Sequence, residues 1–97
     1  MKIVYTRRTL FELEEIGAYI AARNPQAATR VRTAIRRSVN LLRAFPRRGR
    51  KQKSRNVYRI GAGKYPYHIF YRFDAATRVV TVLSIYHTAR RPRHKNT

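Results

Sequence analysis

Residues 65–86 read YPYHIFYRFDAATRVVTVLSIY, and this stretch decides the fold. From residue 67 to residue 73, large apolar residues occupy every second position, which is typical of a strand with one buried face. Residues 74–77, DAAT, predict a turn, and the β-branched run at 79–86 predicts a second strand that returns antiparallel to the first. Residues 57–60, VYRI, predict an earlier strand. The second half of the chain is therefore expected to form a small, mostly antiparallel sheet.

An apolar stripe at helical spacing precedes the sheet, over residues 28–45. Asn24 and Pro25 mark its start, because asparagine is a favoured N-cap and proline fits the first helical position. Pro46 and Gly49 mark its end. The stripe that we expect to face the core consists of Ala28, Val31, Ile35, Val39, Leu42 and Phe45.

A shorter helical pattern lies upstream and ends near Arg23. Thr9 and Glu12 have the form of a capping box, and Thr6 is a competing cap about one turn earlier. Residues 3–5, IVY, predict a brief strand before this helix. Because few residues separate the two helices, they should form an antiparallel hairpin. The sequence thus predicts an α+β fold in which an N-terminal helical hairpin packs on the sheet.

The charge of the chain is large and unevenly distributed. The chain has 23 Lys and Arg against four acidic residues, a formal net charge of +19 at neutral pH. Three of the acidic residues, Glu12, Glu14 and Glu15, are close neighbours, and the fourth is Asp74. Such a chain repels itself and attracts nucleic acids or acidic proteins.

The composition also argues against several classes of protein. The 97 residues suffice for one domain, and the absence of cysteine rules out a disulfide framework and a thiolate zinc site. The three histidines lack the spacing of metal ligands. No apolar run approaches the roughly 18–20 residues of a membrane span. We therefore expect a cytoplasmic protein without a metal, a cofactor or a membrane partner.

Four segments carry a family pattern in their order and spacing. They are NPQAA at 24–28, FPRRGR at 45–50, YPYHIFYR at 65–72 and IYHTARR at 85–91. In this combination the chain resembles the RelE/ParE superfamily of type II toxin–antitoxin toxins, over almost its whole length.

The resemblance implies one toxin domain at residues 1–92, followed by a basic tail at residues 93–97. It also implies a cognate acidic antitoxin that neutralises the toxin. The hairpin and the Tyr-Pro-Tyr strand look more like the ParE branch, whose members are associated with poisoning DNA gyrase, whereas RelE-like members cut mRNA in the ribosome. The expected function is growth inhibition by binding a cellular target such as gyrase, with a ribosome-dependent mRNA endoribonuclease as the alternative.

The alternative requires an acid, a base and cations at one phosphate, without a metal. Its candidate catalytic residues are Tyr86 and His87, with Arg72 and Arg90 as the cations. Because Tyr86 and His87 are adjacent on a strand, their side chains should point to opposite faces unless the strand is bulged or ends there. Asp74 is the one carboxylate in this half and lies in a turn. The residues alone do not decide between an enzyme and a binding protein.

A basic loop is the other candidate for contact with a partner. Residues 47–55 contain six basic residues and no apolar residue, which predicts a solvated loop. Arg72 is less easily explained by solubility, because it lies on a strand otherwise lined with aromatic residues and a charge there needs water or a partner. The residues expected to contact an antitoxin, a nucleic acid or another target are Lys51, Lys53, Arg55, Arg59, Arg72, Arg90 and Arg91.

Overall fold

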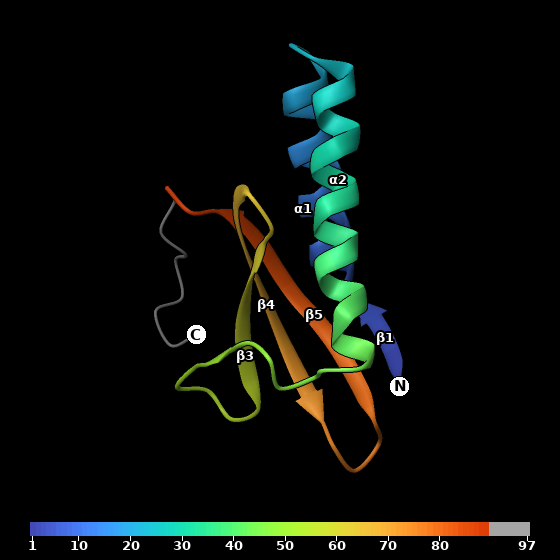
Figure 1. The fold of residues 1–97 in the computed structure, drawn as a ribbon, viewed down its shortest axis with the longest axis vertical. Helices are drawn as coiled ribbons and strands as arrows, with labels where there is room; N and C mark the ends of the chain where they lie inside the picture. Colours follow the sequence, from blue (N-terminus) through green and yellow to red (C-terminus); the bar gives the residue numbers. More distant parts are fainter. Residues whose placement is uncertain (90–97) are drawn as a thin grey trace.

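The computed structural model describes residues 1–89, in which two helices lie on one face of a five-stranded sheet (Figure 1). The strand order is β1-β5-β4-β3-β2, with β1 parallel to β5 and all other pairs antiparallel. The predicted α+β fold is confirmed. No helix in residues 1–89 is long and apolar enough to cross a membrane. The elements are β1 (Lys2–Tyr5), α1 (Arg7–Ala21), α2 (Pro25–Asn40), the 3-10 helix η1 (Leu41–Arg43), β2 (Arg50–Lys51), β3 (Val57–Ala62), β4 (Tyr65–Asp74) and β5 (Val79–His87).

Each helix begins at a polar side chain that accepts a hydrogen bond from its first turn. The Asn24 side chain accepts from the Ala27 N–H at 3.1 Å, so the predicted start of α2 is confirmed. For α1, Thr6 is the cap, accepting from the Thr9 N–H at 3.1 Å. Thr9 is not the cap: it is fully buried, and its hydroxyl donates to the Val82 carbonyl at 2.8 Å. This bond fixes the first turn of α1 against β5.

The apolar stripe of α2 packs on the sheet but ends earlier than the sequence predicts. Ile35 and Leu42 are fully buried, whereas the Phe45 side chain is 60% exposed. The α-helix ends at Asn40, and η1 follows it with three rather than 3.6 residues per turn. The changed period rotates Phe45 away from the core, so its predicted burial is wrong.

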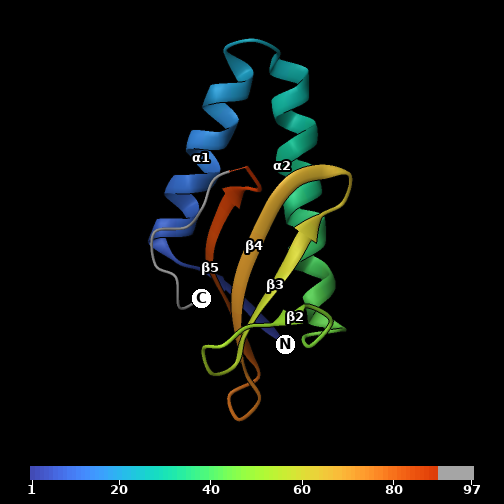
Figure 2. The ribbon, with the colours of Figure 1, turned by 90° about the vertical axis from the view of Figure 1, so that its left-hand side faces the viewer.

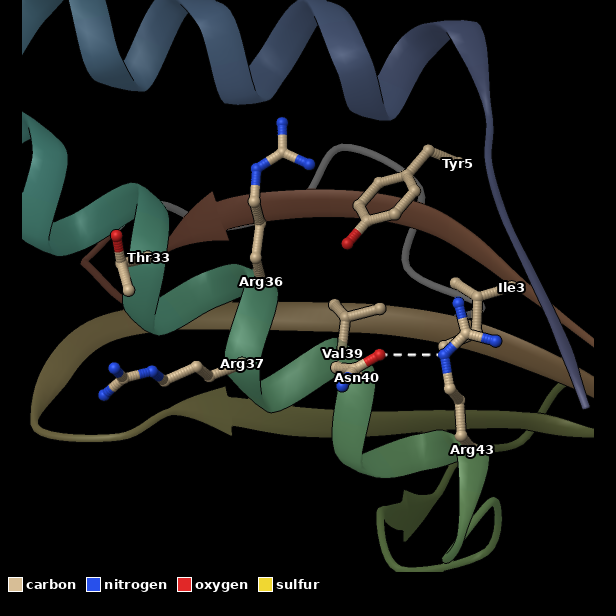
Figure 3. Close-up of a pocket in the computed structure, with 8 residues that line it drawn as sticks. All are labelled: Ile3, Tyr5, Thr33, Arg36, Arg37, Val39, Asn40 and Arg43. Carbon is tan, nitrogen blue, oxygen red and sulfur yellow. Dashed lines mark hydrogen bonds between the residues drawn. The ribbon is translucent and has the colours of Figure 1, made fainter.

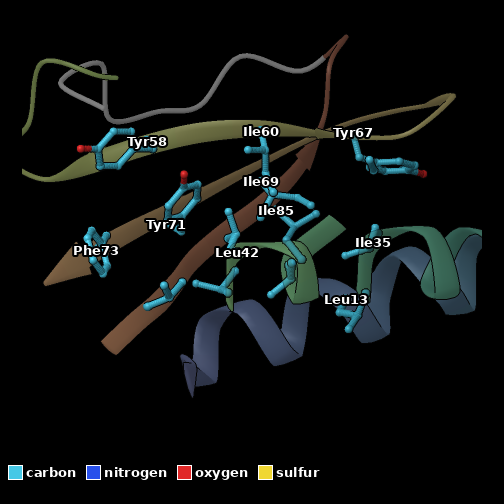
Figure 4. Close-up of a cluster of buried hydrophobic side chains, with 14 of the residues drawn as sticks. Leu13, Ile35, Leu42, Tyr58, Ile60, Tyr67, Ile69, Tyr71, Phe73 and Ile85 are labelled. Carbon is cyan, nitrogen blue, oxygen red and sulfur yellow. The ribbon is translucent and has the colours of Figure 1, made fainter. Parts of the chain in front are cut away.

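The alternation predicted for β4 is observed. Tyr67, Ile69, Tyr71 and Phe73 are buried and face the helices (Figure 4). The register between β4 and β5 shifts at one point: Tyr71 pairs with Val82, but Phe70 pairs with Ser84. Leu83 is thus an extra residue in β5, a β-bulge.

The basic loop after η1 is partly a strand, because β2 pairs with β3 at the sheet edge. The start of the loop is held by the Tyr71 hydroxyl, which donates to the Pro46 carbonyl at 2.7 Å and accepts from the Gly49 N–H at 3.1 Å. A Cβ on Gly49 would lie 2.8 Å from this hydroxyl and 2.9 Å from the Arg59 carbonyl. Only glycine fits there, which gives the FPRRG motif a structural role.

Candidate functional site

The face of the sheet turned away from the helices carries a group of cationic and aromatic side chains. Figure 2 shows this face toward the viewer, with both helices behind it. The strand register places its members in neighbouring rows, with Arg59 opposite Phe70 and His68 opposite Tyr86. Arg72 follows on the same face of β4 and is exposed. We call Arg59, His68, Phe70, Arg72 and Tyr86 the outer-face cluster.

The rings of the outer-face cluster hold each other in place. Tyr86 stacks on Phe70 with ring centroids 5.5 Å apart, and meets His68 edge-on at 5.6 Å. The Nδ1 atom of His68 is buried and has no hydrogen-bond partner among the described residues. Burial, reinforced by the nearby charge of Arg59, lowers the pKa of His68, so its imidazole is neutral at neutral pH. Burial raises the pKa of Tyr86, although Arg59 opposes this effect, so the phenol keeps its proton.

Tyr86 and His87 face opposite sides of the sheet, as strand alternation requires. The His87 ring meets Tyr67, on the helix side, edge-on at 5.3 Å, and its Nδ1 accepts from the Ala89 N–H at 3.0 Å. The bulge at Leu83 precedes both residues, so it does not bring them to one face. The acid–base pair of the nuclease alternative is therefore not assembled from these two side chains.

The cations predicted from the sequence are divided between several places. Arg59 and Arg72 belong to the outer-face cluster, but Lys51 does not join them. In the β2–β3 register Lys51 is opposite Tyr58, whose ring belongs to the core, and Arg50 is opposite Arg59. Like charges directly opposite one another in a sheet are destabilising, so this Arg–Arg pair has a cost that an anionic partner would relieve.

The remaining predicted cations lie farther along the chain. Lys53 and Arg55 are exposed in the loop between β2 and β3. Arg90, Arg91 and the tail at residues 93–97 lie outside the described residues. His68 was missed by the sequence analysis. Its position in the alternation of β4 shows that it shares a face with Arg72, but its pairing with Tyr86 depends on the bulged register.

A groove between α1 and the end of β5 forms a second candidate site, which we call the α1–β5 groove. Its volume is about 710 Å³, and its lining includes His87, Glu12, Glu15, the exposed rings of Phe11 and Tyr19, and part of Tyr86, whose ring nevertheless stacks on Phe70 on the outer face. Two carboxylates, Glu12 and Glu15, thus line the same groove as His87, although the sequence placed them only at the start of a helix.

Glu12 has a structural role in this groove. One of its oxygens accepts from the Ile85 N–H at 2.8 Å, and the other pairs with Arg8 at 3.1 Å. The first bond is needed because β1 pairs with β5 only as far as Val82, which leaves the Ile85 N–H without a strand partner. Glu12 therefore joins α1 to β5 where the sheet has an open edge.

Comparison with known proteins identifies the family. The model of the ParE toxin of the type II toxin–antitoxin system parDE matches residues 3–92. "Putative toxin Y4kP" of Sinorhizobium fredii (strain NBRC 101917 / NGR234) is 35% identical over 82 residues, which cover 84% of this chain and 85% of that protein.

Two solved structures share the fold. A chain of the chromosomal ParDE system from P. aeruginosa superposes with a TM-score of 0.72 at 20% identity, covering 90% of this chain and 95% of that one. A chain of the intact E. coli RelBE toxin–antitoxin complex superposes with a TM-score of 0.68 at 18% identity, covering 93% of this chain and 98% of that one. The family match and the shared fold agree with the resemblance seen in the sequence: this chain belongs to the ParE toxin family of type II toxin–antitoxin systems.

Proposed function

We propose that this chain inhibits growth by binding a cellular target, DNA gyrase being the first candidate, and that a cognate acidic antitoxin neutralises it. The family supports a toxin role. The net charge of +19 favours an acidic partner, through electrostatic steering and paired contacts. Gyrase and the ribosome both work in the cytoplasm, which is where we place this protein.

The separation of the Tyr86 and His87 side chains is the observation that favours a binding function over a catalytic one. RNA cleavage without a metal needs a base and an acid at the same phosphate, and these two side chains lie on opposite faces. Binding needs no proton transfer. It needs an accessible surface, and the outer-face cluster offers exposed Arg72 beside stacked rings.

A supercoiling assay with purified gyrase tests this proposal. We expect the wild-type chain to inhibit supercoiling at about stoichiometric concentration. Arg72→Ala should weaken inhibition markedly. The matched control is Arg30→Ala, which removes an exposed arginine from α2, outside the outer-face cluster, and should not weaken inhibition. Full supercoiling in the presence of excess wild-type chain would exclude gyrase as the target.

The nuclease alternative keeps one specific observation in its favour. His68, Tyr86 and Arg59 lie together on the outer face, and they offer a neutral imidazole, a protonated phenol and a guanidinium. These are a base, an acid and a cation. If the chain cleaves mRNA on the ribosome, His68→Gln and Tyr86→Phe should each slow cleavage by about 100- to 10,000-fold. His87→Ala should leave it intact. Absence of cuts with wild-type chain and translating ribosomes supports the binding proposal.

The antitoxin part of the proposal has its own kinetic signature. Because the attraction is long-range, association with an acidic antitoxin should slow strongly as salt rises from low to physiological concentration, while dissociation changes less. Stopped-flow mixing at two ionic strengths measures both rates. An association rate that does not depend on salt would contradict the electrostatic argument.

A further inference from the structure

A third concave site lies on the helix side of the sheet, between β1 and the C-terminal half of α2 (Figure 3). This open depression has a volume of about 440 Å³, and we call it the basic pocket. Its lining combines an apolar part with a cationic part. The apolar part consists of Ile3, Tyr5 and Val39, and the cationic part consists of Arg36, Arg37 and Arg43.

Arg43 is already held in position, and Arg36 lies over an aromatic ring. The Nε of Arg43 donates to the Asn40 side chain at 2.8 Å, and its Nη1 donates to the Met1 carbonyl at 2.9 Å. The guanidinium carbon of Arg36 lies 5.8 Å from the centroid of the Tyr5 ring (Figure 3). A ligand that pairs with these groups loses less conformational entropy than one that must order free side chains.

The charge of the basic pocket is not balanced within the chain. All four acidic residues are described by the structure, and none of them lines this pocket. Glu12 pairs with Arg8, and Asp74 accepts from the N–H groups of Ala76 and Thr77 in its own turn. Gathering arginines around one cavity without a counter-charge is unfavourable, and an anionic partner would reverse the sign of that energy.

We propose that the basic pocket receives an acidic segment of the antitoxin in which an apolar side chain is flanked by carboxylates. The apolar side chain packs on the partly buried Ile3 and Tyr5, and the carboxylates pair with Arg36 and Arg43. Carboxylates match the planar guanidinium fork. A nucleic-acid backbone would supply anions but no aliphatic group for the apolar part, which favours a peptide. This inference rests on the proposed neutralisation by an antitoxin.

Fluorescence anisotropy with the full chain tests the proposal, using as probe a labelled synthetic peptide in which leucine is flanked by glutamates. Arg36→Ala and Arg43→Ala should each weaken binding by about tenfold or more, the value of one charge-assisted hydrogen bond. Arg30→Ala removes the same charge from an exposed position of α2 outside the pocket and should change affinity by no more than about twofold. Both pocket arginines are exposed, so circular dichroism should show unchanged folding.

Altered probes test the two halves of the recognition separately. Replacing the glutamates of the peptide by glutamine, or its leucine by serine, should each reduce binding to the wild-type chain. Equal losses in Arg30→Ala and Arg36→Ala would mean that the peptide responds only to net charge, and would overturn the proposal. Tighter binding of a single-stranded oligothymidylate, with the same dependence on Arg36 and Arg43, would assign the pocket to nucleic acid instead.

Growth after induction separates failure of this inference from failure of the proposed function. If the wild-type chain arrests growth but the peptide does not bind through Arg36 and Arg43, the pocket assignment is wrong and the toxin role stands. If the peptide binds through them but the wild-type chain does not arrest growth, the pocket assignment holds and the proposed function is wrong.

Discussion

The two faces of the sheet differ in the polarity of their side chains although they are built from the same strands. On the helix side Ile69, Tyr71 and Ile85 are almost completely buried in an apolar core. On the outer side, His68 and Tyr86 carry polar groups beside cations. Adjacent residues thus serve opposite faces. The difference teaches that the period of two separates the apolar core from the outer-face cluster, so substitutions in the core should cost more stability than substitutions in the cluster.

The largest stability effect is expected on the helix side, at Ile35. This side chain is fully buried, and Ile35→Ala removes its packing and leaves a cavity, which should lower the free energy of unfolding by about 2–4 kcal/mol. Urea denaturation measures it. The exposed Thr29→Ala on the same helix is the control. A melting temperature unchanged by Ile35→Ala would mean that α2 presents a different face to the sheet.

Tyr71→Phe should have the next largest effect, because it keeps the ring but removes the hydroxyl that joins the sheet to the loop. The Pro46 carbonyl and the Gly49 N–H would each lose a partner, at a cost of about 1–3 kcal/mol. Tyr58→Phe is the matched control, since that ring stacks on Tyr71 with centroids 5.4 Å apart. Equal destabilisation by both variants in thermal unfolding would contradict a specific role for the Tyr71 hydroxyl.

A smaller effect is expected on the outer face, where stability should depend on pH through His68. Its pKa is lowered in the folded state by burial and by Arg59, so protonation favours unfolding. The contribution is complete above the unfolded-state pKa of about 6.5 and is lost as pH falls through the folded-state value. His68→Gln should remove this part of the pH dependence of the free energy of unfolding. His87→Gln, on the other face, should retain it. Denaturation at several pH values measures this dependence. If His68→Gln kept the pH dependence of the wild-type chain, the assignment to His68 would be refuted.

The smallest stability effect is expected at Arg72, where function and stability should separate most clearly. Because Arg72 is exposed, Arg72→Gln should change the free energy of unfolding by no more than about 0.5 kcal/mol. The same variant should lose much of its growth inhibition, since it removes a charge from the outer-face cluster. Thermal unfolding checks the stability of this variant, and colony counts after induction check its growth inhibition. A stable Arg72→Gln chain with full toxicity would remove Arg72 from the target surface.

Local sequence signals predicted most of the fold. The Asn24–Pro25 start of α2 and the alternation of β4 depend on near neighbours, and the structure confirms both. The errors have two causes, a distant contact at Thr9 and a local change of helix type before Phe45. The Thr9 hydroxyl donates to the Val82 carbonyl instead of capping the helix. Phe45 turns outward because the helix changes its period beyond Asn40.

The candidate sites were harder to predict than the fold, because they depend on strand register. Arg59 and Arg72 could be named as cations, but the pairing of His68 with Tyr86 requires the bulge at Leu83. The basic pocket combines residues of β1 with residues of α2, which only the packed hairpin brings together. A helical arginine such as Arg36 is hard to distinguish in sequence from one on a solvated face.

Pulse labelling after induction tests the central claim most directly, that this toxin acts by binding rather than by cleaving RNA. Incorporation of labelled thymidine and methionine is followed in cells that express the wild-type chain or His87→Ala, with message ends mapped in parallel. We predict that thymidine incorporation falls first, that messages stay intact, and that His87→Ala remains inhibitory. Early loss of methionine incorporation with codon-positioned cuts in the wild type, whether or not His87→Ala keeps them, would contradict the account.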